Sequence, residues 1–372
     1  MPLSNKNSNI IFIENEDINR DSSGGVMSYI INLSSYFMSI GLSTTLIGSG
    51  KALGDNKSNC KFSKYFSISE NPAVNNLKFL IKLFKTSQLK NINKNDIIHV
   101  QRPEMVIPLA LRKQNKIICT LHGGQDLAVL KKKGRVIAFF YSILQYIAFV
   151  MVDELIVVDK KNHERYIQKY SWIKKKINLI PISVDTNKFY PKNKIECKAK
   201  FSFSLDKKIL LFIGRLEYEK NVEFIINSFN NIKNNHYKLV IVGAGSLESK
   251  LKKLACLHSY DIDFLGEIDN TLIPDLLNSS DLLLLASIFE GSPTVVKEAL
   301  CCNVPVVSTD VGDVKEVLSL VDGGEIIEFT TSSFVNAVDK VLSKENWDIN
   351  KAPNLFSHML MGKKTLTIYN QS

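Results

Sequence analysis

The feature that most constrains this chain is an alternation of short apolar runs with longer segments of helical period, in two successive series. In the first series the apolar runs cover residues 9–14, 44–48, 97–100, 117–121 and 154–158. In the second they cover residues 209–213, 238–242, 263–265, 282–286 and 304–308. Strands that alternate with helices form parallel sheets covered on both faces. The pattern therefore predicts an α/β chain with two doubly wound domains.

The length and the turn signals indicate where the two domains meet. A chain of 372 residues suits two domains, because single cores stop growing near ~250–300 residues. Turn and charge signals cluster between Pro181 and Lys194, with Asp185 among them. We expect domains at 1–185 and 186–353, followed by a terminal helix in 354–372.

The composition excludes several classes of protein. With 45% hydrophobic residues, 20 Phe and 23% charged residues, the chain is not disordered. The six Cys show no metal or disulfide spacing, and Cys301 and Cys302 are adjacent. We expect buried, reduced thiols and no metal site.

The charge is uneven along the chain. Residues 1–185 hold 26 Lys+Arg against 14 Asp+Glu, whereas residues 186–372 hold 21 against 23. A basic half can attract nucleic acid or an anionic membrane surface, although a lysine-rich background composition gives the same excess. We find no helix-turn-helix, zinc finger or basic stretch interleaved with aromatics, so we expect no nucleic-acid partner.

One uncharged segment bears on whether the protein contacts a membrane. Residues 136–152 carry no charge and follow the basic run 131–135, which puts them at the short limit for a membrane span. Ser142 and Gln145 interrupt the run, and a strand follows at once, so we favour a buried core helix over a membrane-docking element or a span. The polar N-terminus lacks a signal-peptide pattern. We therefore expect a cytoplasmic protein, with a peripheral position at the inner face of the cell membrane as an option.

Two loops that follow strands of the first series could carry chemistry. Gly24 and Gly25 precede a helix and would let backbone amides approach a phosphate, although a plain tight turn explains them equally well. His122 follows a strand directly and is itself followed by two glycines, a setting that favours a functional over a structural histidine. Asp126 could cap the next helix or orient a polar substrate.

Two loops of the second series suggest a diphosphate site. Arg215 and Lys220 lie five residues apart in one loop, and a guanidinium with an ammonium suits a diphosphate. Gly243 begins a Gly-Ala-Gly sequence that lacks the third glycine of a dinucleotide fingerprint. We interpret it as close backbone packing near a ligand and not as an NAD site.

The most specific loop lies between residues 289 and 299. Ser292 could cap a helix whose first residue is Pro293, which places Glu290 before the helix and Glu298 on its second turn. The free amides of the first turn would lie between the two carboxylates. Such a site suits a sugar nucleotide. The residues that would form this part of it are Gly291, Ser292, Pro293, Thr294 and Val295.

Together these loops resemble a known family. The Glu290-x7-Glu298 spacing, the Gly214-Arg215-x4-Lys220 loop and the Gly24-Gly25 loop are similar to those of retaining glycosyltransferases of family 4, with the GT-B fold. The resemblance extends over nearly the whole chain. It implies two Rossmann-like domains that face a central cleft, the first on the acceptor side and the second binding the nucleotide sugar. It also implies that the terminal helix returns to the first domain.

The resemblance further implies roles for individual residues. Arg215 and Lys220 would neutralise the diphosphate leaving group, Glu298 would bind the ribose and Glu290 the donor sugar. The segment with Phe264 and Leu265 resembles the nucleobase region, Gly25 would approach the phosphates and His122 would lie near the reacting centre. No cofactor would be required, and a UDP- or GDP-sugar would be the donor. The acceptor would be a lipid-linked or surface-polysaccharide glycan.

Two departures and two alternatives remain open. Ile182-Ser183 stands where the family often has Asn-Gly, and Asp159 stands where it often has Ser, which puts an acceptor-side contact in doubt. A nucleotide-sugar epimerase of the same fold and a catalytically inactive scaffold subunit are the alternatives. The intact set of His122, charged loop residues and paired glutamates favours an active transferase over both.

Overall fold

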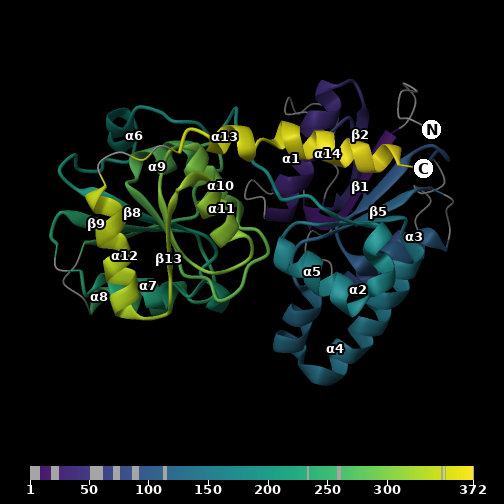
Figure 1. Cartoon of the computed structure of the whole chain (residues 1–372), viewed down its shortest axis with the longest axis horizontal. Helices are drawn as coiled ribbons and strands as arrows, with labels where there is room; N and C mark the ends of the chain where they lie inside the picture. The colour runs from purple at the N-terminus through teal and green to yellow at the C-terminus, as the bar shows by residue number, and fades with distance from the viewer. Residues whose placement is uncertain are drawn as a thin grey trace. The chain divides into compact units, whose positions relative to one another are not determined.

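The computed structural model describes residues 9–17, 25–50, 62–69, 76–85, 92–111, 115–232, 234–257, 261–344, 347 and 349–371. Contacts divide the chain into two units (Figure 1), one of Met1–Ile182 with His358–Ser372 and one of Ser183–Ser357. The limits lie close to the expected domains 1–185 and 186–353. They differ because Val184 pairs with Ser357 in a β-bridge, which ties residues on both sides of the boundary to the second unit.

The first unit contains a parallel sheet of seven strands in the order β3-β2-β1-β4-β5-β6-β7. Its strands are β1 (Asn9–Asp17), β2 (Ser43–Ser49), β3 (Lys64–Ser67), β4 (Ile97–Val100), β5 (Ile117–Leu121), β6 (Glu154–Val157) and β7 (Ile177–Leu179). Its helices are α1 (Gly25–Ser39), α2 (Asn76–Lys85), α3 (Val106–Ala110), α4 (Gln125–Met151), α5 (Lys160–Lys169) and α14 (His358–Asn370), with short 3-10 turns η2 (Pro103–Met105) and η3 (Ser171–Lys175).

The second unit contains a parallel sheet of six strands in the order β10-β9-β8-β11-β12-β13. The strands are β8 (Lys208–Ile213), β9 (Tyr237–Val242), β10 (Ile262–Gly266), β11 (Leu282–Leu285), β12 (Val306–Thr309) and β13 (Gly324–Ile327). The helices are α6 (Lys194–Lys200), α7 (Val222–Phe229), α8 (Glu248–Cys256), α9 (Ile273–Ser279), α10 (Thr294–Cys301), α11 (Val314–Val321), α12 (Thr331–Ser343) and α13 (Ala352–Leu355), with the 3-10 turn η4 (Tyr218–Lys220).

Each sheet is covered on both faces, as the apolar runs require. In β1, Ile10 and Phe12 belong to the hydrophobic cluster that includes α1 and α14, whereas Ile11 belongs to the cluster on the other face. In β8, Leu210 and Leu211 divide between two clusters in the same way. Successive side chains of a strand point to opposite faces, so a continuous apolar run marks a strand buried on both. The predicted α/β class with doubly wound sheets is confirmed.

One sequence expectation fails and a second holds only in part. The segment 136–152 is not a buried core helix, because only 22% of the window Gly134–Met151 is buried, although by length and composition this helix could cross a membrane. Four of the five cysteines in the described residues are buried, but Cys256 is exposed. Periodicity could not separate these cases, because a surface helix with a second apolar face has the composition of a core helix.

Helix α14 packs against α1 within the first unit (Figure 1). The Tyr369 hydroxyl lies 2.6 Å from Nδ1 of His99, whose Nε2 lies 2.7 Å from Oγ1 of Thr120. Burial lowers the pKa of His99 to about 3, so this ring stays neutral. At Gly362 an added Cβ would lie 2.2 Å from the Tyr36 ring, so the helix packing requires glycine there.

We therefore expect Gly362→Ala to destabilise the first unit by about 1–3 kcal/mol through overpacking. Without the clash, alanine in a helix interior would stabilise the protein by about 0.8–1 kcal/mol, so the sign of the change in the free energy of unfolding distinguishes the two cases. Urea unfolding followed by Trp172 fluorescence in a Trp347→Phe background reports on this unit. Gly25→Ala is the matched control, because a Cβ there meets nothing within 4 Å. A more stable Gly362→Ala protein would contradict the packing.

Candidate functional site in the second unit

The order of the strands brings two charged loops together. The chain passes from β8 to β9 on one side and later returns to β11 on the other, so β8 and β11 pair directly. The loops after these strands leave the sheet at its topological switch point, where open α/β sheets bind ligands. The backbone N–H of Ile288 donates to the Glu219 carbonyl at 2.8 Å and joins the two loops.

Side chains connect the loops as well. The Lys220 ammonium donates to Oε1 of Glu290, and the Ser287 hydroxyl donates to the same oxygen at 2.8 Å. Lys220 and Glu290 are both largely buried, with side-chain exposures of 17% and 16%. Arg215 is 70% exposed and donates to Glu219 at 2.9 Å. The predicted Arg215, Lys220 and Glu290 thus lie in one connected cluster, in which Arg215 is the exposed member.

The glycines of the second unit allow backbones to touch. A Cβ at Gly243, where φ is +126°, would lie 1.9 Å from the Gly214 carbonyl oxygen. A Cβ at Gly312, where φ is +55°, would lie 2.1 Å from the Gly291 carbonyl oxygen. Both positions therefore require glycine for close approach and for their backbone conformation. The Gly243 contact fixes the start of the Arg215 loop, and the Gly312 contact fixes the loop that carries Glu290.

Helix α10 follows this loop and begins at Thr294. Pro293, in extended conformation, is its N-cap residue, and no side chain of the described residues caps the helix. The expectation that Ser292 caps α10 is therefore wrong. Its hydroxyl instead donates to Oδ2 of Asp313 at 2.8 Å, because a buried carboxylate is the stronger acceptor. The first-turn amides at Thr294 and Val295 keep the positive end of the helix dipole unneutralised by a side-chain cap.

Asp313 is also paired with Lys297, which sequence reasoning missed. The Lys297 ammonium donates to Oδ2 of Asp313 and to the Ser292 hydroxyl, each at 2.7 Å, and its side chain is 1% exposed. Because a buried charge is costly unless it is paired, this lysine and this carboxylate depend on each other. The available signal was a lysine close in sequence to the apolar residues Val296, Ala299 and Leu300.

Glu298 lies on the second turn of α10, and the pKa of its carboxyl is raised. Burial raises the pKa of this carboxyl to about 7, against the lowering effects of the Lys188 charge and a hydrogen bond with Thr294. A carboxyl that titrates near neutral pH is common at functional sites. Phe264 and Leu265, on β10, are partly buried and pack against different clusters, because successive side chains alternate between faces.

The candidate residues of the first unit lie after β5 and at the start of α1. Gly24 lies outside the described residues, and Gly25 is the first residue of α1. Nε2 of His122 lies 2.8 Å from Oε1 of Gln101. The His122 ring packs edge-on against the Tyr29 ring, with the ring centroids 4.9 Å apart. Its buried Nδ1 has no hydrogen-bond partner among the described residues. Burial, aided by the charge of Arg102, lowers the pKa of His122 to about 3, so the imidazole is neutral.

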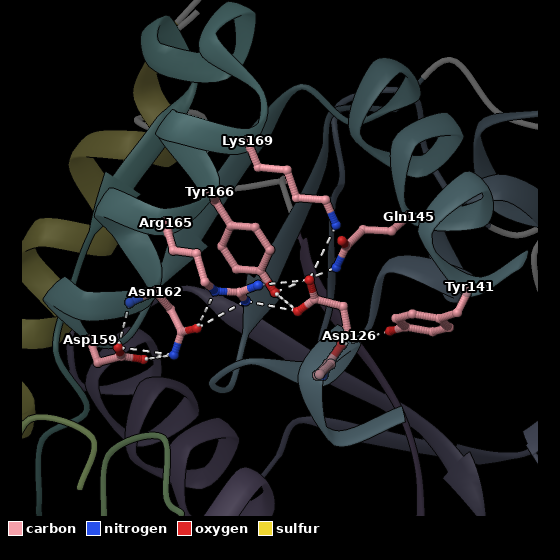
Figure 2. Close-up of polar contacts among 9 residues, drawn as sticks. Asp126, Tyr141, Gln145, Asp159, Asn162, Arg165, Tyr166 and Lys169 are labelled. Carbon is pink, nitrogen blue, oxygen red and sulfur yellow. Dashed lines mark hydrogen bonds and ion pairs between the residues drawn. The ribbon is translucent and has the colours of Figure 1, made fainter. Parts of the chain in front are cut away.

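Asp126 does not cap α4, and its carboxylate is paired with cations of α5. Figure 2 shows its carboxylate held by α5, with Arg165 donating to both oxygens at 2.7 and 2.8 Å and Lys169 at 3.3 Å. Asp159 caps α5 through the Asn162 amide at 2.8 Å. An aspartate serves this cap as a serine would, so the departure at Asp159 preserves the local structure.

The comparisons with known proteins agree with this geometry. The model of Glycosyltransferase Family 4 matches residues 23–188, and the model of Glycosyl transferases group 1 matches residues 193–354. The N-acetyl-alpha-D-glucosaminyl L-malate synthase of Bacillus anthracis is 30% identical over 277 residues, which cover 71% of this chain and 68% of that one.

A second relative is named for a lipid-linked substrate. The UDP-Gal:alpha-D-GlcNAc-diphosphoundecaprenol alpha-1,3-galactosyltransferase of Escherichia coli is 26% identical, with 73% of each chain covered. The match to another curated relative, an uncharacterised glycosyltransferase of Methanocaldococcus jannaschii, spans 62% of that protein's length.

Among solved structures, Anabaena HepE in complex with UDP and glucose superposes with a TM-score of 0.77 at 13% identity, covering 97% of this chain and 98% of that one. At that identity the likeness shows the fold alone. With the family models and the Bacillus relative, it leads to one conclusion: the chain belongs to the group 1, or family 4, glycosyltransferases, enzymes with the GT-B fold.

Proposed function

We propose that this glycosyltransferase moves a sugar from a nucleotide-diphosphate sugar to a hydroxyl of a lipid-linked or surface-polysaccharide glycan, with retained anomeric configuration. The observation that carries the proposal is the contact of Lys220 with Glu290 beside the uncapped start of α10. It brings two cationic side chains, the Glu290 carboxylate and a helix N-terminus into one part of the second unit.

The leaving diphosphate would bind this cationic part. Arg215 and Lys220 would neutralise its charge, and the amides at Thr294 and Val295 would donate to its oxygens. Two fixed cations take the role that a metal ion has in other transferases, so we propose that no cofactor is required. When the diphosphate binds Lys220, Glu290 would be released to accept hydrogen bonds from the donor sugar. Gly291 and Pro293 would let the phosphates approach the backbone.

The carboxylate of Glu298 would accept hydrogen bonds from the ribose hydroxyls, and the segment at Phe264 and Leu265 would contact the base. The HepE structure contains UDP, which supports a uracil nucleotide as the first donor to test. GDP-sugars remain the second choice.

In the transfer step, the bond between the anomeric carbon and the leaving phosphate oxygen breaks while the acceptor oxygen bonds on the same face. The acceptor proton passes to that phosphate oxygen, because the described residues present no obvious covalent nucleophile. His122 would assist the acceptor as a neutral ring. With Nε2–H directed to Gln101, its Nδ1 lone pair would accept a hydrogen bond from a substrate hydroxyl.

Two observations support the proposed acceptor class. The Escherichia coli relative is named for an undecaprenol-linked diphosphate substrate. The first 185 residues carry 26 cationic against 14 anionic side chains, which suits an anionic membrane surface. We propose that the protein is cytoplasmic and peripheral at the inner face of the cell membrane.

The first prediction concerns nucleotide binding. One of UDP, GDP, ADP, TDP and CMP, with EDTA present, should raise the melting temperature of the protein, and Glu298→Ala should lose that shift. A ligand at 100 times its Kd adds about 2.7 kcal/mol of stability. Glu196→Ala, an exposed glutamate on α6, is the matched control and should keep the shift. If no nucleotide shifts the wild type, the inactive-scaffold alternative gains support.

The second prediction concerns pH. Binding of the ribose hydroxyls needs the Glu298 carboxylate, so affinity should be full above its pKa of about 7 and fall as the pH drops. Affinity for the sugar nucleotide that binds should weaken about tenfold from pH 8 to pH 6. A sugar nucleotide is used in calorimetry because, unlike a free diphosphate, it has no group that titrates in that range. Glu298→Gln should flatten the profile, and an unchanged slope in that variant would refute the assignment.

The third prediction concerns the buried pair that holds the loop. Lys297→Met leaves the Asp313 carboxylate unpaired and should destabilise the second unit by about 3–5 kcal/mol. Lys297→Met with Asp313→Leu should recover most of that loss, yet nucleotide binding should stay weak because Ser292 has lost its anchor. Urea unfolding followed by Trp347 in a Trp172→Phe background measures the stability. A double variant no more stable than the single one would contradict the pairing.

A further inference from the structure

Helix α4 has two apolar faces, of which the fold uses one. It bends at Gly134, where φ is 81° and ψ is 175°, and then continues to Met151. Gln145, Ala148 and Phe149 are fully buried, and the last two belong to the core of the first unit. The helix is therefore attached to the unit along one side.

The other side of α4 is an apolar stripe exposed to solvent. Its members recur at intervals of three and four residues, which places them on one face of the helix. They are Val136 (71% exposed), Phe139 (63%), Phe140 (64%), Ile143 (44%), Ile147 (42%) and Val150 (54%). The stripe runs for roughly 20 Å at 1.5 Å per residue. Contiguous apolar surface of this extent marks an interaction site more often than ordinary surface.

A second helix of the same unit repeats the pattern. On α2, Leu77, Ile81 and Phe84 are exposed at helical spacing, while Phe79 and Leu83 are fully buried. Lys78, Lys82 and Lys85 lie among the exposed positions. Both α2 and α4 contact α3, so the two helices are neighbours within the unit.

Aromatic and basic residues lie next to the stripe. Tyr146 and Trp172 are 48% and 43% exposed, and their ring centroids are 5.7 Å apart. The Lys176 ammonium lies 5.2 Å from the Trp172 ring, and Lys174 and Lys175 precede it. Amphipathic aromatics and lysines with long apolar stems are the residues that proteins place at the level of lipid headgroups.

We propose that the stripe of α4 inserts into the headgroup and acyl boundary of an anionic bilayer, with the helix lying in the membrane plane. The inference rests on the proposed function, since a lipid-linked acceptor lies in that bilayer. A helix across the membrane is disfavoured, because its buried face, with Phe149, belongs to the core. A second copy of the chain is the other possible occupant. Charge disfavours a second copy, because residues 1–185 of each copy carry 26 cationic against 14 anionic side chains and the two copies would repel each other. An anionic lipid surface complements this excess of positive charge.

The test is flotation with vesicles of phosphatidylcholine, alone or with about 30% phosphatidylglycerol. The full-length protein should float with the anionic vesicles. Phe139→Ser/Phe140→Ser should lower the partition coefficient at least tenfold, and the difference should persist at about 0.5 M salt, where surface charge is screened. Leu205→Ser/Leu257→Ser removes two similarly exposed leucines from the second unit and should change nothing.

Two outcomes would overturn the proposal. Equal flotation of wild type and the double Phe variant would show that the stripe does not insert. A dimer in light scattering that the Phe variant abolishes, without vesicle binding, would assign the stripe to a second copy. The nucleotide panel on the wild type separates the two proposals: vesicle binding without any nucleotide shift counts against the enzymatic function and leaves the membrane surface intact.

Discussion

The direct pairing of β8 with β11 determines where the chemistry of the second unit can lie. Because β9 and β10 lie on one side of this pair and β12 and β13 on the other, the loops after β8 and β11 meet at the switch point. One loop supplies Arg215 and Lys220 and the other Glu290. The glycines at 243 and 312 then allow the neighbouring backbones to touch, so the loops are held by contacts that a side chain would prevent.

The buried pair of Lys297 and Asp313 leaves the start of α10 without a side-chain cap. A site for a diphosphate needs an uncapped helix end, but the loop before α10 must be held without a side chain occupying that end. The buried Lys297 and Asp313 provide the anchor, because they draw the Ser292 hydroxyl away from the helix. The first-turn amides then remain available to an anion. A buried ion pair is weak evidence of stability, so we infer that this pair serves to fix the conformation of the loop before α10.

The sequence predicted the sheets well, because strands buried on both faces read as continuous apolar runs. It did not predict β3, β7 and β13, which are edge strands with weak apolar patterns and, in β13, a glycine at the first position. It placed the charged loops correctly because residues after strands collect at one edge. It could not find partners far apart in sequence. Asp126 meets Arg165, and Lys297 meets Asp313, only after helices pack, so the proposed caps at Ser292 and Asp126 were wrong for the same reason.

The central claim is that a nucleoside diphosphate binds the start of α10 and the loop after β8. Hydrogen–deuterium exchange of the whole protein, with and without the nucleotide that shifts its melting temperature, tests this claim most directly. The account predicts slower exchange of the amides in 291–296 and 214–221, with Glu298→Ala reducing the effect in both. Protection elsewhere in the chain, with these two segments unchanged, would contradict it.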